Sequence, residues 1–187
     1  MRKSTLPAPR PQSVTIPSVR LDRRQFRFLI RFAILLTVFF VLIFLGPVDR
    51  NVIVPFTRGL TRVSAVLLNL LGQGVTVHGT VIQGRSFAVD IKGGCNGVEA
   101  MLLLCAAIAA FDAPWRARLM GLLAGSAALM AFNLVRIVSL YMIGERWRAL
   151  FDTFHLAVWQ TIMFAVAASI FAYWSGRFAS RHVAARS

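Results

Sequence analysis

Residues 28–45, FLIRFAILLTVFFVLIFL, are apolar throughout except for Arg31 and one threonine. A helix of this length nearly crosses the hydrocarbon core of a bilayer, which is about 30 Å thick. Several arginines precede the run, and positive charge beside an apolar run marks the cytoplasmic side of a membrane. No small-residue cleavage site follows it, so we expect an uncleaved first transmembrane helix rather than a signal peptide.

The whole chain has the composition of an integral membrane protein. Of its 187 residues 57% are hydrophobic, and the mean hydropathy is +0.67. The 21 Lys and Arg residues outnumber the 7 Asp and Glu residues. Most of this positive charge borders apolar runs, so it indicates membrane orientation rather than nucleic-acid binding. No CxxC or His/Cys cluster suggests zinc or haem, and we expect neither a metal nor a cofactor.

Three further apolar runs have the length of membrane helices. They cover residues 95–111, 119–143 and 155–175. A short basic turn at 112–118 and an external loop at 144–154 would separate them. We therefore expect four transmembrane helices in the cell inner membrane, with both termini in the cytoplasm. The expected parts are a disordered basic tail (1–24), a membrane domain (25–176) and a basic C-terminal tail (177–187).

The segment between the first and second helices changes character twice. Residues 51–72 place Arg58 and Arg62 on one helical face and apolar residues on the other, which predicts an amphipathic helix on the extracytoplasmic side. Residues 75–91 then alternate polar and apolar, which predicts a β-hairpin turning at Gln83-Gly84. The expected fold is thus an all-α membrane protein with four transmembrane helices, one amphipathic helix and a small β-hairpin.

Residues 93–100, GGCNGVEA, mark the change from this hairpin to the second membrane helix. Cys95 would fall in the first turn of that helix, where the partial positive charge favours a thiolate. Taken alone, such a cysteine is better explained as a small residue packed at a helix end. Cys105 lies about 15 Å further along the same helix, too far for a disulfide with Cys95.

Two polar residues on the other helices share the expected depth of Cys95. Arg136 would lie about 25 Å along the third helix, near its outer end, and His155 would open the fourth helix on the outside. An arginine near hydrocarbon costs a few kcal/mol and is by default a functional hypothesis. The alternatives are an arginine that reaches the outer interface or one that pairs with Glu99. Asn133 shares the helical face of Arg136.

The motifs Cys95-Asn96-Gly97-Val98 and Asn133-Leu134-Val135-Arg136, followed by His155, resemble in this order the exosortase/archaeosortase family, in its compact form most like exosortase H. The resemblance implies a membrane-embedded cysteine protease/transpeptidase. It assigns Cys95 as the nucleophile, Arg136 to the oxyanion and His155 to acid–base catalysis. Asn133, Glu99 and Asn96 would support them. The implied substrates are exported proteins with a C-terminal motif, a transmembrane helix and a basic tail.

Two other function classes fit parts of the sequence. A non-enzymatic membrane assembly factor would bind partner helices through small-residue faces such as that of Gly121 and Gly125. A small transporter would use Arg136 and Glu99 to line an anion path. Replacing Cys95 separates the enzyme from both alternatives, because only the enzyme needs the thiol.

Overall fold

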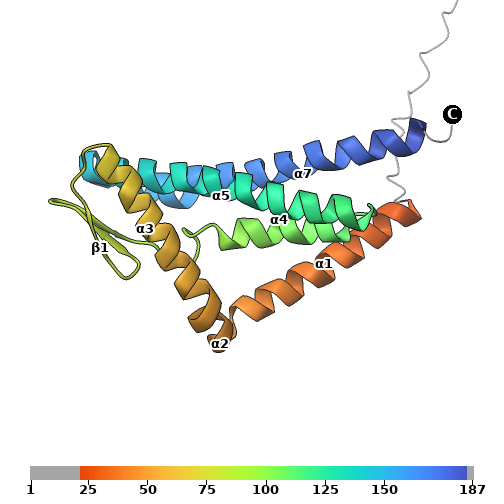
Figure 1. The fold of residues 1–187 in the computed structure, drawn as a ribbon, viewed down its shortest axis with the longest axis horizontal. Coiled ribbons are helices and arrows are strands. Elements are labelled where there is room, and N and C mark those ends of the chain that lie inside the picture. The colour runs from red at the N-terminus through yellow and green to blue at the C-terminus, as the bar shows by residue number, and fades with distance from the viewer. Residues whose placement is uncertain (1–21, 185–187) are drawn as a thin grey trace, which may run out of the picture.

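The computed structural model describes residues 22–184, so the expected N-terminal tail lies almost wholly outside the described residues. The helices are α1 (Arg23–Ile43), α2 (Gly46–Val48), α3 (Val54–Leu70), α4 (Val98–Ala110), α5 (Trp115–Arg146), α6 (Arg148–Thr153) and α7 (Trp159–Ala184). Two π-helical turns, Asp49–Ile53 and Phe154–Val158, join α2 to α3 and α6 to α7. Figure 1 shows α4, α5 and α7 running roughly side by side, with α3 inclined across them.

Within residues 22–184, three helical stretches are long and apolar enough to cross a membrane. They are α1, α5 and the continuous stretch Arg148–Arg177, which contains α6 and most of α7. The helix α4 has 13 residues, fewer than the roughly 20 that a straight crossing needs. It is nevertheless buried on several sides, packed against α1, α5 and α7. The protein is therefore a helical membrane protein, while four complete spans stay a prediction.

Two of the expected helix boundaries are wrong. The external loop predicted at 144–154 is almost entirely helical, because α5 continues to Arg146 and α6 begins at Arg148. No proline interrupts this segment, and its residues can stay helical, so the chain resumes a helix after Trp147. The predicted basic tail at 177–187 is likewise helical as far as Ala184.

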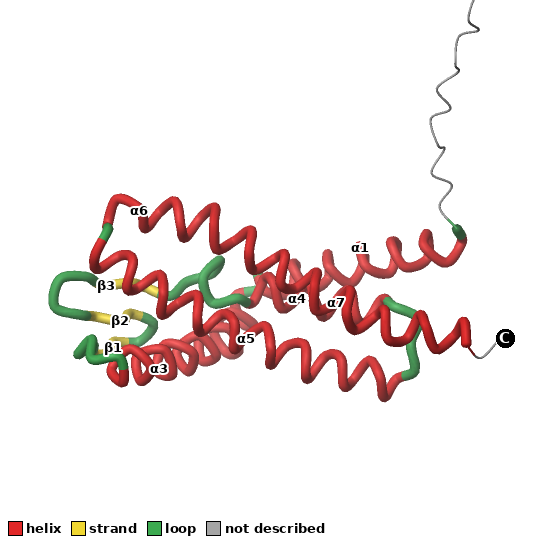
Figure 2. Tube along the Cα trace, turned by 90° about the horizontal axis from the view of Figure 1, so that it is seen from above, coloured by secondary structure: helices red, strands yellow, loops and turns green. Residues whose placement is uncertain are grey.

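The start of α1, the turn between α4 and α5 and the end of α7 lie at one end of the molecule, and the sheet and α6 lie at the other (Figures 1 and 2). At the first end, Arg31 Nη1 donates a hydrogen bond to Asp112 Oδ1 at 2.6 Å. This bond lowers the pKa of the Asp112 carboxyl below its ordinary value. The side of the membrane on which each terminus lies stays a prediction.

The helix α3 is amphipathic, but its buried face carries hydroxyl groups. Thr57, Thr61 and Ser64 are buried, and each hydroxyl donates to the carbonyl four residues earlier at 2.8–2.9 Å. These bonds satisfy the hydroxyls within the helix, so the face can pack against protein. The opposite apolar stripe, which includes Val63 and Val66, is exposed, as expected for a helix lying at a membrane.

The segment after α3 forms three short strands rather than the predicted two-stranded hairpin. β1 (Thr76–His78), β2 (Val81–Gln83) and β3 (Ala88–Asp90) pair antiparallel in that order. The additional turn lies between His78 and Val81, where Gly79 adopts φ +68°. The sheet contributes Ile82 and Ile91 to a core shared with α3 and α5. It leads directly into residues 93–97, the loop that precedes α4.

Candidate functional site

Cys95 lies in the loop of residues 93–97, two residues before the N-cap of α4. The prediction that the thiol falls in the first turn of the helix is therefore wrong. Gly97 adopts φ +77°, a left-handed conformation that prevents the helix from continuing back to Cys95. The loop is nonetheless ordered by its own backbone, because the N–H groups of Cys95 and Asn96 both donate to Lys92 O, at 3.0 and 3.1 Å.

Two charged side chains hold Gly94, the residue before the thiol, from opposite sides. Its N–H donates to Glu99 Oε1 at 2.7 Å, and its carbonyl accepts from Arg136 Nη2 at 2.9 Å. Arg136 is 1% exposed and turned into the protein, so the alternative in which it reaches the outer interface is wrong. No ion pair joins it directly to Glu99 among the described residues. Glu99 and Arg136 instead each form a hydrogen bond with the backbone of Gly94.

Gln160 of α7 is a second partner of the arginine. Its Oε1 accepts from Arg136 Nη2 at 3.3 Å, so α4, α5 and α7 all contribute to this cluster. Sequence reasoning missed Gln160. The available signal was its isolation as a polar residue in an otherwise apolar run, five positions after His155.

Asn96 connects the loop to α3. Its Nδ2 donates to Thr57 Oγ1 at 3.1 Å, and its Oδ1 accepts from the N–H of Val98 at 3.1 Å. The side chain therefore satisfies one free N–H at the start of α4 while it ties that helix to α3. Thr57 precedes Asn96 by 39 residues, and no motif in the sequence links the two.

Asn133 lies beneath Gly97 and is fully buried, one turn before Arg136 on the same side of α5. A Cβ atom added to Gly97 would lie 2.8 Å from Asn133 Cγ and 3.0 Å from Asn133 Nδ2. Position 97 therefore requires a glycine for two reasons: the backbone has a positive φ, and a Cβ atom would clash with Asn133. The Asn133 side-chain amide has no hydrogen-bond partner in the described part of the chain.

Burial dominates the electrostatics of the thiol. Cys95 is 5% exposed, and this burial raises the pKa of its thiol above the ordinary value. The positive charge of Arg136 works in the opposite direction, and the negative charge of Glu99 raises the pKa further. The thiol is therefore protonated at rest, contrary to the expected thiolate, and attack by its sulfur requires a base.

His155 belongs to the π-helical turn between α6 and α7, where it is half-buried. Its ring stacks on Phe151 with centroids 5.5 Å apart. Because α6 precedes this turn without a break, His155 lies inside a continuous helical stretch, whereas the sequence predicted it at the beginning of a helix. The charge of Arg136 acts on both Cys95 and His155. Cys95 and His155 are thus both near enough to the Arg136 guanidinium to feel its charge, although no hydrogen bond joins the three side chains to one another within residues 22–177.

Comparison with known families identifies the family of this chain. The family model described as transmembrane exosortase (Exosortase_EpsH) matches residues 19–173, which is most of the chain and includes Cys95, Arg136 and His155. This chain belongs to the transmembrane exosortase family. Membership gives it a membrane location and a role related to protein sorting. No curated protein and no solved structure matches the chain.

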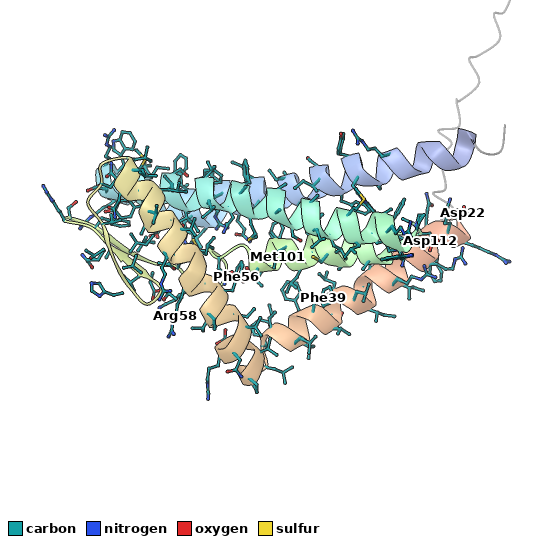
Figure 3. All side chains as sticks on the ribbon, in the orientation of Figure 1. Asp22, Phe39, Phe56, Arg58, Met101 and Asp112 are labelled. Atoms are coloured by element: carbon teal, nitrogen blue, oxygen red, sulfur yellow. The ribbon has the colours of Figure 1, made fainter. Side chains whose placement is uncertain are left out.

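This exosortase also has an apolar groove of about 500 Å³ between α3 and α5. It is lined by Pro55, Phe56, Gly59, Leu60, Val63, Ala127, Met130, Ala131 and Leu134. Met130 lies against the loop as well, because its Cε is 3.0 Å from the position of a Gly97 Cβ. In Figure 3, Phe56 lies on the side of α3 that faces α4, and Arg58 lies on the side away from it. The groove thus has Met130 in its lining, and the same side chain lies against Gly97 in the loop that contains Cys95.

Proposed function

We propose that this exosortase is a cysteine protease/transpeptidase of the cell inner membrane that cleaves a C-terminal sorting signal of exported proteins. The observation that carries the proposal is the hydrogen bond from buried Arg136 to the carbonyl of Gly94, the residue before Cys95. A fixed guanidinium beside a thiol is the arrangement that acyl transfer requires, because negative charge develops near the attacking sulfur. In the proposed orientation the site faces the extracytoplasmic side and both termini are cytoplasmic.

The first chemical step is activation of the buried thiol. His155 takes the proton from Cys95, whose raised pKa makes the thiol form dominant at rest. The resulting thiolate attacks the carbonyl carbon of the scissile peptide, and the carbonyl electron pair moves to the oxygen. Arg136 stabilises that oxyanion. A donor of this kind is worth about 3–4 kcal/mol in serine proteases.

The second step transfers the acyl group. The oxyanion collapses, the peptide C–N bond breaks, and His155 returns the proton to the leaving amine. Cys95 then carries a thioester, which an amine or water attacks to release the product. Glu99 and Asn96 support this chemistry indirectly. Glu99 fixes Gly94, and Asn96 fixes the loop against α3.

The proposed substrates carry a C-terminal motif, a transmembrane helix and a basic tail. The groove between α3 and α5 supports this class, because it is apolar and reaches the Cys95 loop at Met130. Gly59 faces open space, and Ala127 and Ala131 are exposed one turn apart on α5. Small residues let the backbone of another helix approach closely, so the groove suits an apolar helix.

The test is replacement of Cys95 in cells that express a tagged exported protein ending in an apolar helix and an arginine cluster. We expect Cys95→Ala to accumulate the unprocessed precursor, detected as a larger band in an immunoblot. Cys105→Ala is the matched control, because Cys105 is the other free cysteine and lies in α4 beside Ser126. Normal processing by a stably inserted Cys95→Ala protein would exclude the enzyme. That result would favour the assembly factor, which needs no thiol.

A further inference from the structure

Asn133 and Arg136 carry most of the unsatisfied buried polar atoms in this structure. Within residues 22–177, five buried side-chain atoms have no hydrogen-bond partner, and three of them are Asn133 Nδ2, Asn133 Oδ1 and Arg136 Nε. Asn133 is 0% exposed and Arg136 is 1% exposed. The two residues lie one turn apart on the same side of α5. The unsatisfied atoms are therefore concentrated at one place.

Unpaired groups of this kind are energetically costly. A buried donor or acceptor without a partner costs about 1–3 kcal/mol, and buried polar groups in native proteins are almost always paired. Asn96 illustrates the normal case, since it is equally buried and both of its side-chain atoms are bonded. The same kind of side chain at Asn133 has neither bond. Such an exception is expected where a donor receives its partner only during the reaction.

The side chains of Arg136 and Asn133, which carry these unpaired atoms, both contact the loop of residues 93–97 that contains Cys95. Arg136 bonds to the carbonyl of Gly94, and the Asn133 amide lies against Gly97. Cys95 stands between these two glycines in the chain. A carbonyl attacked by its sulfur would therefore come close to both the Arg136 Nε–H and the Asn133 Nδ2–H groups.

We propose that Asn133 is a catalytic residue of this exosortase, supplying the second hydrogen-bond donor to the oxyanion beside Arg136. This assignment rests on the proposed function. As the sulfur–carbon bond forms, the carbonyl π pair moves to the oxygen, which accepts hydrogen bonds from Asn133 Nδ2 and Arg136 Nε. When the C–N bond breaks, the carbonyl is restored, and the amine leaves with the proton carried by His155. Neither donor has to break an existing bond, so both are organised before charge develops.

The test replaces Asn133 by leucine, which is similar in size but has no donor. The substrate is the tagged exported protein described above, incorporated with the purified enzyme into liposomes. We expect kcat to fall by about 10²–10³, as when an oxyanion donor is removed elsewhere, while KM stays within about twofold. The thermal unfolding midpoint should stay the same or rise, because the variant removes buried groups that have no partner.

Asn69→Leu is the matched control. Unlike the Asn133 amide, the Asn69 side-chain amide is paired: it donates to Val75 O at 3.0 Å and accepts from the N–H of Val75 at 2.6 Å. Its replacement should lower the unfolding midpoint while leaving kcat per folded molecule unchanged. If Asn133→Leu does not fold, Asn133→Ala, which also lacks the donor, is measured in its place with the same expected loss of kcat.

Two results would overturn the assignment of Asn133. One is a kcat for Asn133→Leu within threefold of wild type. The other is a loss of activity that follows a lowered unfolding midpoint, as a bound structural water at Asn133 would produce. Both leave the proposed function intact, provided that Cys95→Ala is inactive in the same liposomes. Wild-type turnover by Cys95→Ala would instead overturn the proposed function itself.

Discussion

Replacing Gly97 by alanine tests whether the Cys95 loop is held against α5 as closely as the structure indicates. Gly97 has φ +77°, and a residue with a Cβ costs about 1–2 kcal/mol in that region. The new Cβ would also lie 2.8 Å from Asn133 Cγ and 3.0 Å from Met130 Cε. Overpacking a buried site adds about 1–3 kcal/mol, so Gly97→Ala should lose about 2–5 kcal/mol of unfolding free energy.

Gly94→Ala separates the two contributions. Gly94 has a similar φ of +82°, but nothing lies within 4 Å of its Cβ position. It should lose only the backbone contribution, about 1–2 kcal/mol. The assay is equilibrium unfolding of the purified protein in mixed detergent micelles, followed by helical circular dichroism. Alkylation of Cys95 should also become faster in Gly97→Ala, because a displaced loop exposes the thiol.

A double variant locates the clash. Adding Asn133→Ala to Gly97→Ala removes the amide that the new Cβ would meet, so the double variant should lose less than the two single variants together. Equal losses for Gly97→Ala and Gly94→Ala, with additive behaviour in the double variant, would refute the contact between the loop and α5.

Three further variants test other parts of the site. Glu99→Gln removes a negative charge that raises the pKa of the Cys95 thiol. The pKa of the Cys95 thiol should therefore be lower in this variant, and alkylation of Cys95 by iodoacetamide should begin at a lower pH than in wild type. An unshifted pH profile of alkylation would contradict this. Thr57→Val leaves Asn96 Nδ2 without its acceptor and should lower the unfolding free energy by about 1–3 kcal/mol; no loss would mean that this bond does not hold α3. Gly121→Leu places a side chain where a Cβ alone would lie 2.5 Å from the indole of α7. It should abolish recovery of folded protein from detergent, and a wild-type yield would argue against this helix contact.

The sequence predicted the long apolar helices better than the local geometry of the candidate site. Hydropathy and arginine placement identify the long apolar helices, because these signals do not depend on how the helices are rotated. The energetic cost of placing an arginine in an apolar helix likewise makes Arg136 a functional hypothesis before any of its contacts are known. The prediction that Cys95 lies in the first turn of a helix was wrong, because the pattern of apolar residues does not show that Gly97 takes a left-handed conformation.

Contacts between distant segments could not be predicted from single motifs. Gln160 and Thr57 contact the site because α7 and α3 are rotated about their axes so that these side chains face it. In a mostly apolar helix, the sequence carries no clear periodic signal for this rotation. The strands are three residues each, too short for alternation to fix their number. Gly121 does allow close helix packing, but its neighbour is the indole of Trp174 in this chain's own α7, and binding of a partner helix there stays a prediction.

The central claim is that Cys95 forms a thioester with the substrate, and mass spectrometry of Cys95 tests it most directly. The purified enzyme is mixed with the tagged exported protein, quenched in acid and digested, and the peptide containing Cys95 is analysed. We predict an adduct of Cys95 with the substrate segment on the N-terminal side of the cleaved bond, removable by hydroxylamine and absent in His155→Ala, which lacks the base that activates the thiol. Processed substrate with Cys95 always unmodified, or an adduct on another residue, would contradict the account.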